Sequence, residues 1–91
     1  MKVIDKRNHK KPKVSVVMSV YNDSEFLEKS IKSILNQKFK NFEFIILNDG
    51  STDNSEKIIK KYLKKSKKIL YIYSKYNKGL TFMLNLGIKH V

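Results

Sequence analysis

The stretch that decides the fold reads Phe44-Ile45-Ile46-Leu47-Asn48-Asp49-Gly50-Ser51-Thr52-Asp53. Its first four residues are apolar without alternation, which is typical of a strand buried on both faces of a sheet. The Asn-Asp-Gly triplet favours a sharp turn, because these residues tolerate or supply positive φ. Ser, Thr and Asp then offer N-caps to a helix. The stretch therefore predicts strand, turn and helix, with Asp49 at the carboxyl end of a strand, where open α/β sheets bind ligands.

The same alternation extends over the rest of the chain. Apolar and β-branched runs predict strands over residues 14–20, 42–47 and 69–73. Helical spacing of apolar residues predicts helices over about 25–37, about 53–65 and from residue 80 onward. Because strands alternate with helices, we expect a parallel sheet with right-handed crossovers. The predicted fold is a Rossmann-like, three-layer α/β arrangement in the order β-α-β-α-β-α.

Two local details follow from the pattern. Asn22 with Glu25 has the spacing of a capping box for the first helix, with Asp23 and Ser24 as rival caps. Gly87 lies on the predicted buried side of the last helix, which favours close backbone packing over a break. The apolar residues expected on that side are Leu80, Met83, Leu84 and Ile88.

Residues 1–12 are basic and end at Pro12. They lack the apolar segment of a secretory signal, so we expect a disordered basic arm. Residues 13–91 then form a single domain, since 91 residues allow one domain at most. No cysteine is present and no run of about 18 apolar residues occurs. We therefore expect a cytoplasmic protein, with the cytoplasmic membrane face as the alternative location.

The formal net charge of +12 attracts polyanions such as nucleic acid, anionic lipid or nucleotide phosphates. Nearly all of the positive charge is lysine, and the chain has one arginine, the residue best suited to forked phosphate contacts. A lysine surface that is merely solvated is the simpler interpretation. Nucleic acid is accordingly not the partner we expect.

Several site chemistries are excluded by the motifs. Tyr-Asn-Asp-Ser follows the first strand in place of a glycine-rich phosphate loop. His9 and His90 do not make a credible metal site. Ser19 and Ser51 have no histidine nearby in the expected topology, so a Ser-His-Asp triad does not form.

Polar residues instead gather where the three strands end. Tyr21 can stack on a base, Asp49 can accept hydrogen bonds from a base or a ribose, and Asn77 and Lys78 can reach polar or phosphate groups. These side chains suit a nucleoside. The alternative is that Asp49 only forms a turn, Tyr21 only packs and Asn22 only caps a helix.

Three blocks of the chain resemble family 2 glycosyltransferases with the GT-A fold. They are Val14 to Asp23, the run Ser33-Ile34-Leu35-Asn36-Gln37, and Ile46 to Asp53. Two later blocks, Asn77-Lys78-Gly79-Leu80 and Asn85-Leu86-Gly87-Ile88, also match. The resemblance covers about residues 13–91. Each piece alone is weak, but Val-Tyr-Asn after one strand and Asn-Asp-Gly-Ser-Thr-Asp after the next form a specific combination.

The resemblance implies a nucleotide-sugar site, with a UDP-sugar as the expected donor. It implies that Val20 and Tyr21 lie against the uracil and that Asp49 binds the base or ribose. The loop of Asn77, Lys78 and Gly79 would border the nucleotide pocket. Ser19 stands where many members have proline, which loosens the turn. A saccharide or lipid-linked acceptor is implied as well, as in polysaccharide biosynthesis.

The resemblance also implies parts that this chain lacks. The family's Asp-x-Asp metal motif follows soon after the segment matching residues 85–88, and the catalytic base lies further on. We therefore expect a divalent cation, Mn or Mg, in the parent enzyme and none held by these 91 residues. The chain is expected to be a truncated nucleotide-binding part without catalytic residues or activity of its own.

Two other classes remain as alternatives. One is a non-enzymatic basic α/β module that binds RNA or an anionic membrane surface, with affinity that falls steeply with salt. The other is a phosphoacceptor or flavodoxin-like signalling domain. A phosphoacceptor domain requires paired acids after the first strand and a phosphorylatable Asp after the third. A further expectation concerns assembly: residues 14–20 should form an unpaired sheet edge, so the chain could self-associate through this strand.

Overall fold

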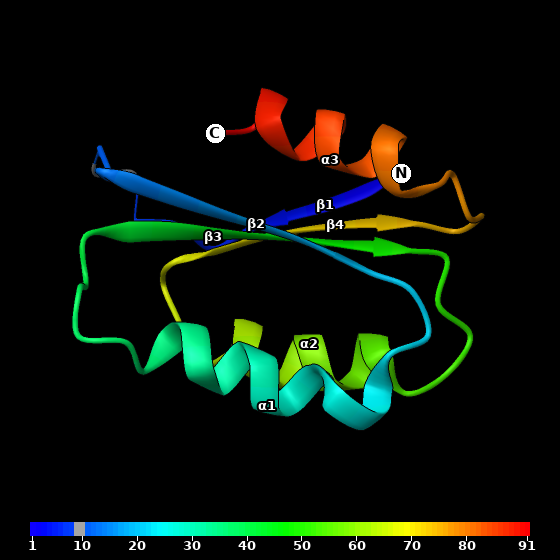
Figure 1. Ribbon diagram of the computed structural model, residues 1–91, viewed down its shortest axis with the longest axis horizontal. Helices are drawn as coiled ribbons and strands as arrows, with labels where there is room; N and C mark the ends of the chain where they lie inside the picture. Colours follow the sequence, from blue (N-terminus) through cyan, green and yellow to red (C-terminus); the bar gives the residue numbers. More distant parts are fainter. Residues whose placement is uncertain (9–10) are drawn as a thin grey trace.

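A computed structural model describes residues 1–8 and 11–91 of the chain. Over these residues the predicted alternation of strands and helices from residue 14 onward is confirmed, and one further strand precedes it (Figure 1). The elements are β1 (Lys2–Asp5), β2 (Val14–Val20), α1 (Ser24–Leu35), β3 (Phe42–Asp49), α2 (Ser55–Leu63), β4 (Ile69–Ser74) and α3 (Leu80–Lys89).

The described strands form one sheet in the order β1-β4-β3-β2. β3 pairs in parallel with β2 on one side and with β4 on the other. Helices α1 and α2 cover one face of the sheet and α3 covers the other, which gives the three layers (Figure 1). Every residue of β3 is buried, because this strand has neighbours at both edges and helices on both faces. The Rossmann-like α/β prediction is confirmed, with one antiparallel strand added.

The prediction of a disordered arm over residues 1–12 is wrong for Lys2–Asp5. This segment is β1, and it pairs antiparallel with β4 in a register that sets Val3 opposite Ile72. The unpaired backbone of the β4 edge supplies donors and acceptors for β1, a tertiary cause that four residues of sequence do not reveal. His9 and Lys10 belong to the same predicted arm and lie outside the described residues.

Arg7 fastens the segment after β1 to the rest of the fold. Its guanidinium donates to the Asp5 carboxylate at 2.8 and 2.9 Å and to Glu43 Oε1 at 2.7 Å. It also donates to the carbonyl oxygen of His90, just after α3, at 2.7 Å. Glu43 is buried in β3, and its other oxygen accepts a 2.6 Å hydrogen bond from the Ser15 hydroxyl. Arg7 thus links the end of β1, the buried carboxylate of β3 and the residue that follows α3.

Alternate residues of β3 supply two hydrophobic cores. Phe44 and Ile46 face α1 and α2, in a cluster that includes Leu27 and Ile59. Ile45 and Leu47 face α3 and pack with its Met83 and with β4. This is the pattern that a period of two produces in a strand covered on both faces.

The close approach predicted at Gly87 is confirmed. A Cβ atom there would lie 2.7 Å from Val17 Cγ1 and 2.9 Å from Leu47 Cδ1. The predicted buried side of α3 is wrong at its ends, since Leu80 and Ile88 are 63% and 62% exposed. The helix is turned so that residues 83, 86, 87 and 90 face the sheet, because glycine lets the backbone come closest there.

β2 is the outermost strand on the side opposite β1, as the edge prediction required. Only Val20, at its end, is buried, and Val14 is 44% exposed. None of the described strands pairs with the outer edge of β2, so its backbone groups there are available to another strand.

Candidate functional site

The carboxyl ends of β2, β3 and β4 meet at one rim of the sheet, with Val20 opposite Asn48 and Asp49 opposite Ser74 (Figure 1). The loops that leave these ends are residues 21–23, 50–54 and 75–79. We call this region the carboxyl rim. The residues predicted for a nucleotide site come together here.

Asp49 is the centre of the carboxyl rim. It is the last residue of β3 rather than part of the predicted turn, and it is buried. Its Oδ1 accepts a 2.6 Å hydrogen bond from the backbone N–H of Lys78, and its Oδ2 accepts one of 2.9 Å from the N–H of Gly79. Its carbonyl oxygen accepts a 3.4 Å bond from Asn77 Nδ2. Asp49 therefore holds the loop of residues 77–79 against the end of β3.

This clamp acts at the start of a helix. Gly79 is the N-cap residue of α3 and has φ of 91°. A carboxylate at a helix N-terminus satisfies N–H groups that lack partners within the helix and lies at the positive end of its dipole. One residue thereby fixes both the helix start and the loop that carries the predicted ligand contacts.

Gly50 lets the two loops touch. Its φ is 76°, and a Cβ atom at this position would lie 2.7 Å from the backbone nitrogen of Asn77 and 2.9 Å from the carbonyl carbon of Tyr76. Any other residue would combine a left-handed backbone with a clash against main-chain atoms. The Asp-Gly pair therefore sets the distance between the β3 and β4 loops.

Asn22 connects the loop after β2 to the loop after β3. Its Oδ1 accepts hydrogen bonds from the backbone N–H groups of Thr52 at 2.7 Å and Asp53 at 3.3 Å, while its own N–H donates to Ser51 Oγ at 3.0 Å. Its φ of 49° is a conformation that asparagine tolerates. The predicted capping box with Glu25 is wrong: α1 has Asp23 at its N-cap position without a side-chain cap bond. Asn22 instead serves the backbone ahead of α2.

Asp53 completes this connection from the other side. Its Oδ2 accepts a 3.0 Å bond from the N–H of Ser24 at the start of α1, and its Oδ1 accepts a 2.9 Å bond from the N–H of Ser55. Hydrogen bonding by Ser55 and Ser24 lowers the pKa of Asp53 to about 2. The carboxylate is therefore charged at neutral pH and holds the start of both helices.

The first strand end contributes one accessible aromatic. Tyr21 is 54% exposed, so its ring is free to stack, whereas the Val20 side chain is buried in the core. Val20 as a whole is only 3% exposed. Tyr76, on the β4 loop, is 67% exposed and is an aromatic at the same rim that the sequence argument missed. Tyr76 could have been predicted from the sequence, because it directly precedes Asn77 in a loop that was expected to lie at the rim.

Asn48 lies beneath the rim and plays a structural role. Its Nδ2 donates to the Tyr71 hydroxyl at 3.0 Å, and its Oδ1 accepts from the N–H of Ser51 at 3.1 Å. Burial raises the pKa of Tyr71, whose hydroxyl also lies 3.4 Å from a Glu56 oxygen. This buried network supports the β3 loop from below.

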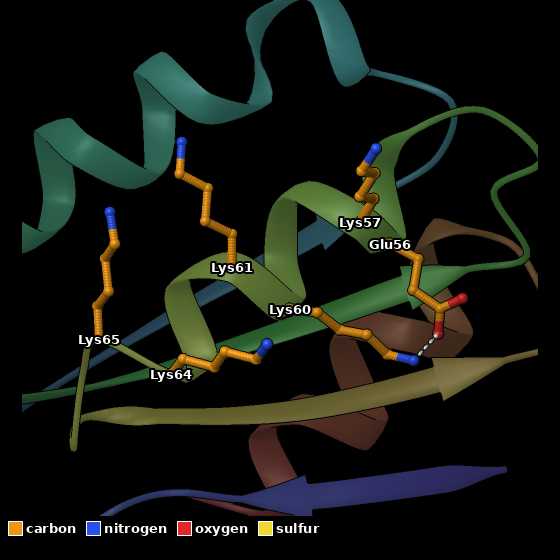
Figure 2. Close-up of a pocket in the computed structure, with 6 residues that line it drawn as sticks. All are labelled: Glu56, Lys57, Lys60, Lys61, Lys64 and Lys65. Carbon is orange, nitrogen blue, oxygen red and sulfur yellow. Dashed lines mark ion pairs between the residues drawn. The ribbon is translucent and has the colours of Figure 1, made fainter.

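Two hollows in the described surface lie away from the rim. One, of about 570 Å³, follows the outer side of α2 and is lined by Glu56 and five lysines (Figure 2). The other, of about 680 Å³, lies at the opposite end of the sheet, around Arg7, Glu43 and His90. Within the described residues no group of three His, Cys, Asp or Glu side chains is placed to hold a metal ion.

Comparison with known proteins identifies the family of this chain. The profile of glycosyl transferase family 2 matches residues 15–91. The chain belongs to this family. The resemblance inferred from the sequence motifs is thereby confirmed, and the matched residues include every element except β1 and the first residue of β2.

Curated relatives agree with this glycosyltransferase assignment. The chain is 42% identical over 77 residues to an uncharacterized glycosyltransferase of Haemophilus influenzae and 45% identical over 80 residues to the putative glycosyltransferase EpsE of Bacillus subtilis. These alignments cover 85% and 87% of this chain. The chain spans 24% and 29% of the two relatives' own lengths.

Solved structures show the same fold in other glycosyltransferases. Residues 1–349 of S. aureus TarS superpose with a TM-score of 0.78 at 27% identity, over 87% of this chain and 24% of that 1–349 chain. A mannosyltransferase from Pyrobaculum calidifontis, solved with GDP-Man and Mn²⁺, superposes with a TM-score of 0.80 at 19% identity, over 96% of this chain and 26% of its own. At that identity the second likeness concerns the fold alone.

Proposed function

We propose that this chain is the nucleotide-sugar-binding part of a glycosyltransferase that uses a UDP-sugar donor. The observation that carries the proposal is the Asp49 clamp, which brings Asn77, Lys78 and Gly79 to the end of β3 beside Tyr21. Support comes from family membership and from TarS, which has been solved in complex with UDP.

In this proposal different residues of the carboxyl rim contact the base, the ribose and the phosphates. Tyr21 stacks on the uracil, and the backbone of Val20 lies beside the ring. Asp49 positions the 77–79 loop with two of its acceptor sites and has further lone pairs for a ribose hydroxyl or base N–H. Lys78, whose side chain is exposed, supplies an ammonium group to the phosphates.

The described residues do not fit a divalent cation. Asp49 already accepts two backbone hydrogen bonds, and the other rim carboxylate, Asp53, is bonded to Ser24 and Ser55. We therefore assign the Mn²⁺ or Mg²⁺ of the parent enzyme, and its catalytic base, to residues beyond these 91. The 91-residue chain alone should not transfer sugar.

The remaining parts of the proposal concern the parent enzyme and its assembly. Its acceptor is a saccharide or a lipid-linked molecule, and it works in the cytoplasm or at the cytoplasmic face of the membrane. The chain on its own pairs β2 with a second copy, because this outermost strand leaves backbone groups unpaired.

Affinity measurements with matched variants test the nucleotide site. Tyr21→Ala should weaken UDP binding roughly tenfold, because stacking on a base contributes about 1–3 kcal/mol, while Tyr21→Phe should bind like wild type. Asp49→Asn should also weaken binding, since one loop N–H loses its acceptor. Asp23→Asn is the control, because its carboxylate lies in the same region without a cap bond.

Two outcomes of this titration would contradict the proposal. One is equal affinity for UDP and AMP in wild type, which would mean that the base is not recognised. The other is UDP binding that Tyr21→Ala leaves unchanged, because Tyr21 is exposed and its loss should not disturb the fold.

A further inference from the structure

We propose that the outer side of α2 is an electrostatic docking surface for a membrane that contains anionic phospholipid. The surface consists of Lys57, Lys60, Lys61, Lys64 and Lys65, and we call it the α2 lysine surface. It lies outside the carboxyl rim, and the proposal does not depend on which nucleotide the rim binds.

The spacing of these lysines places them together. They occupy positions i, i+3, i+4, i+7 and i+8, which is the spacing of a single helix face; Lys57, Lys60 and Lys61 lie in α2, and Lys64 and Lys65 follow its last residue, Leu63. All five are exposed, while Ile59, Tyr62 and Leu63 on the opposite face are buried in the core. The side chains line one shallow hollow of about 570 Å³ along the helix (Figure 2). α2 therefore has an apolar inner face and an almost purely cationic outer face.

Few acids neutralise this surface. Glu56 lies 3.7 Å from Lys60, and Glu28 of α1 binds Lys61 at 2.5 Å. Lys57, Lys64 and Lys65 make no ion pair with any described residue. These three ammonium groups thus have no carboxylate partner, although that of Lys65 lies 5.6 Å from the centroid of the Tyr62 ring. An external anion that binds them relieves their mutual repulsion.

The composition favours a lipid surface over RNA. Proteins that bind RNA use arginine forks and exposed aromatic rings that stack on bases. The chain's one arginine, Arg7, is bound to Asp5 and Glu43, and the one aromatic residue of α2, Tyr62, lies on its buried inner face and is only 5% exposed. Lysine point charges without stacking partners suit a diffuse layer of lipid phosphates.

The position of the surface is compatible with a working carboxyl rim. α2 belongs to the helical layer on one face of the sheet, whereas the rim loops leave the strand ends (Figure 1). Among the described residues, none of the helices is both long and apolar enough to cross a membrane. Docking through α2 would therefore be peripheral and would depend on salt.

Vesicle binding by the 91-residue chain tests the proposal. The probes are vesicles of phosphatidylcholine with phosphatidylglycerol, vesicles of phosphatidylcholine alone, and single-stranded RNA of mixed sequence. Wild type should bind the anionic vesicles and release them at high salt. The triple variant Lys57→Gln, Lys64→Gln and Lys65→Gln should bind on the order of 100-fold more weakly, from roughly fivefold per lysine.

Two controls separate the surface from net charge alone. The variant with Lys2→Gln, Lys6→Gln and Lys89→Gln removes the same charge elsewhere and should weaken binding less than about tenfold. Replacement of Lys57, Lys64 and Lys65 by arginine should retain vesicle binding. Equal losses in the two glutamine variants would overturn the proposal. So would tighter binding to the RNA than to the anionic vesicles at the same salt.

Discussion

At the scale of single residues, two polar side chains of the carboxyl rim organise its loops. Asp49 was predicted to contact a ligand, and Asn22 was predicted to cap the first helix. Asp49 binds the N–H groups of Lys78 and Gly79, and Asn22 binds those of Thr52 and Asp53. Sequence placed these residues at the right end of the sheet, because strand ends in a parallel sheet share one rim. It did not show which neighbours they bind, since those partners lie about thirty residues away in the chain.

Gly50→Ala should destabilise the chain by about 2 kcal/mol or more. The substitution adds a Cβ atom 2.7 Å from the backbone nitrogen of Asn77, at a φ of 76°. Gly79→Ala is the matched control: its φ is 91° but the space around it is open, so it should cost only the backbone strain, about 1 kcal/mol. Urea denaturation measures both, and equal losses would refute the close contact between the loops.

The pKa of Asp53 predicts an acid-dependent loss of stability. Its folded value of about 2 lies below the ordinary 3.8, so the carboxylate stabilises the fold fully above about pH 4. That contribution disappears as the pH falls toward about 2. Asp53→Asn should therefore show a smaller drop of Tm across this range than wild type. Parallel Tm curves for the two proteins would show that the hydrogen bonds to Ser24 and Ser55 are not made in solution.

At the scale of elements, long periodic segments were predictable and short ones were not. The strands after residue 13 and the three helices were found because their apolar residues repeat over many positions. β1 was missed because four residues carry no pattern, and its pairing depends on the open edge of β4. The buried side of α3 was misjudged at Leu80 and Ile88, because the close approach at Gly87 decides how the helix is turned.

Arg7→Ala should destabilise the chain by roughly 2–3 kcal/mol. The change leaves the buried Glu43 carboxylate without its cation and removes the bond to the His90 carbonyl. Lys6→Ala, an exposed neighbour, should have little effect. Combining Arg7→Ala with Glu43→Gln should recover part of the loss, and the absence of any recovery would argue against the ion pair as the cause.

At the scale of the whole molecule, β1 covers the outer edge of β4, and β2 is the terminal strand on the opposite side of the described sheet. The position of β2 at an edge could be predicted. The pairing of the amino-terminal segment with β4 rather than with β2 could not be predicted, because both edges offer similar unpaired backbone.

Self-association through β2 should increase with salt. The net charge of +12 opposes association, and salt screens it over about 10 Å at moderate concentration. Sedimentation velocity should show dimers or larger species at high salt, and Val16→Lys, which places a charge on this strand, should reduce them. A monodisperse monomer at every salt concentration would mean that the outer edge of β2 does not pair with a second copy of the chain.

Recognition of a uridine nucleotide by the carboxyl rim can be measured through amide NMR shifts during titration with UDP. We expect saturable shifts at Tyr21, Lys78 and Gly79, with much smaller shifts for AMP, because Asp49 holds the last two beside the strand end. Shifts confined to the α2 lysine surface, or equal for the two nucleotides, would contradict it.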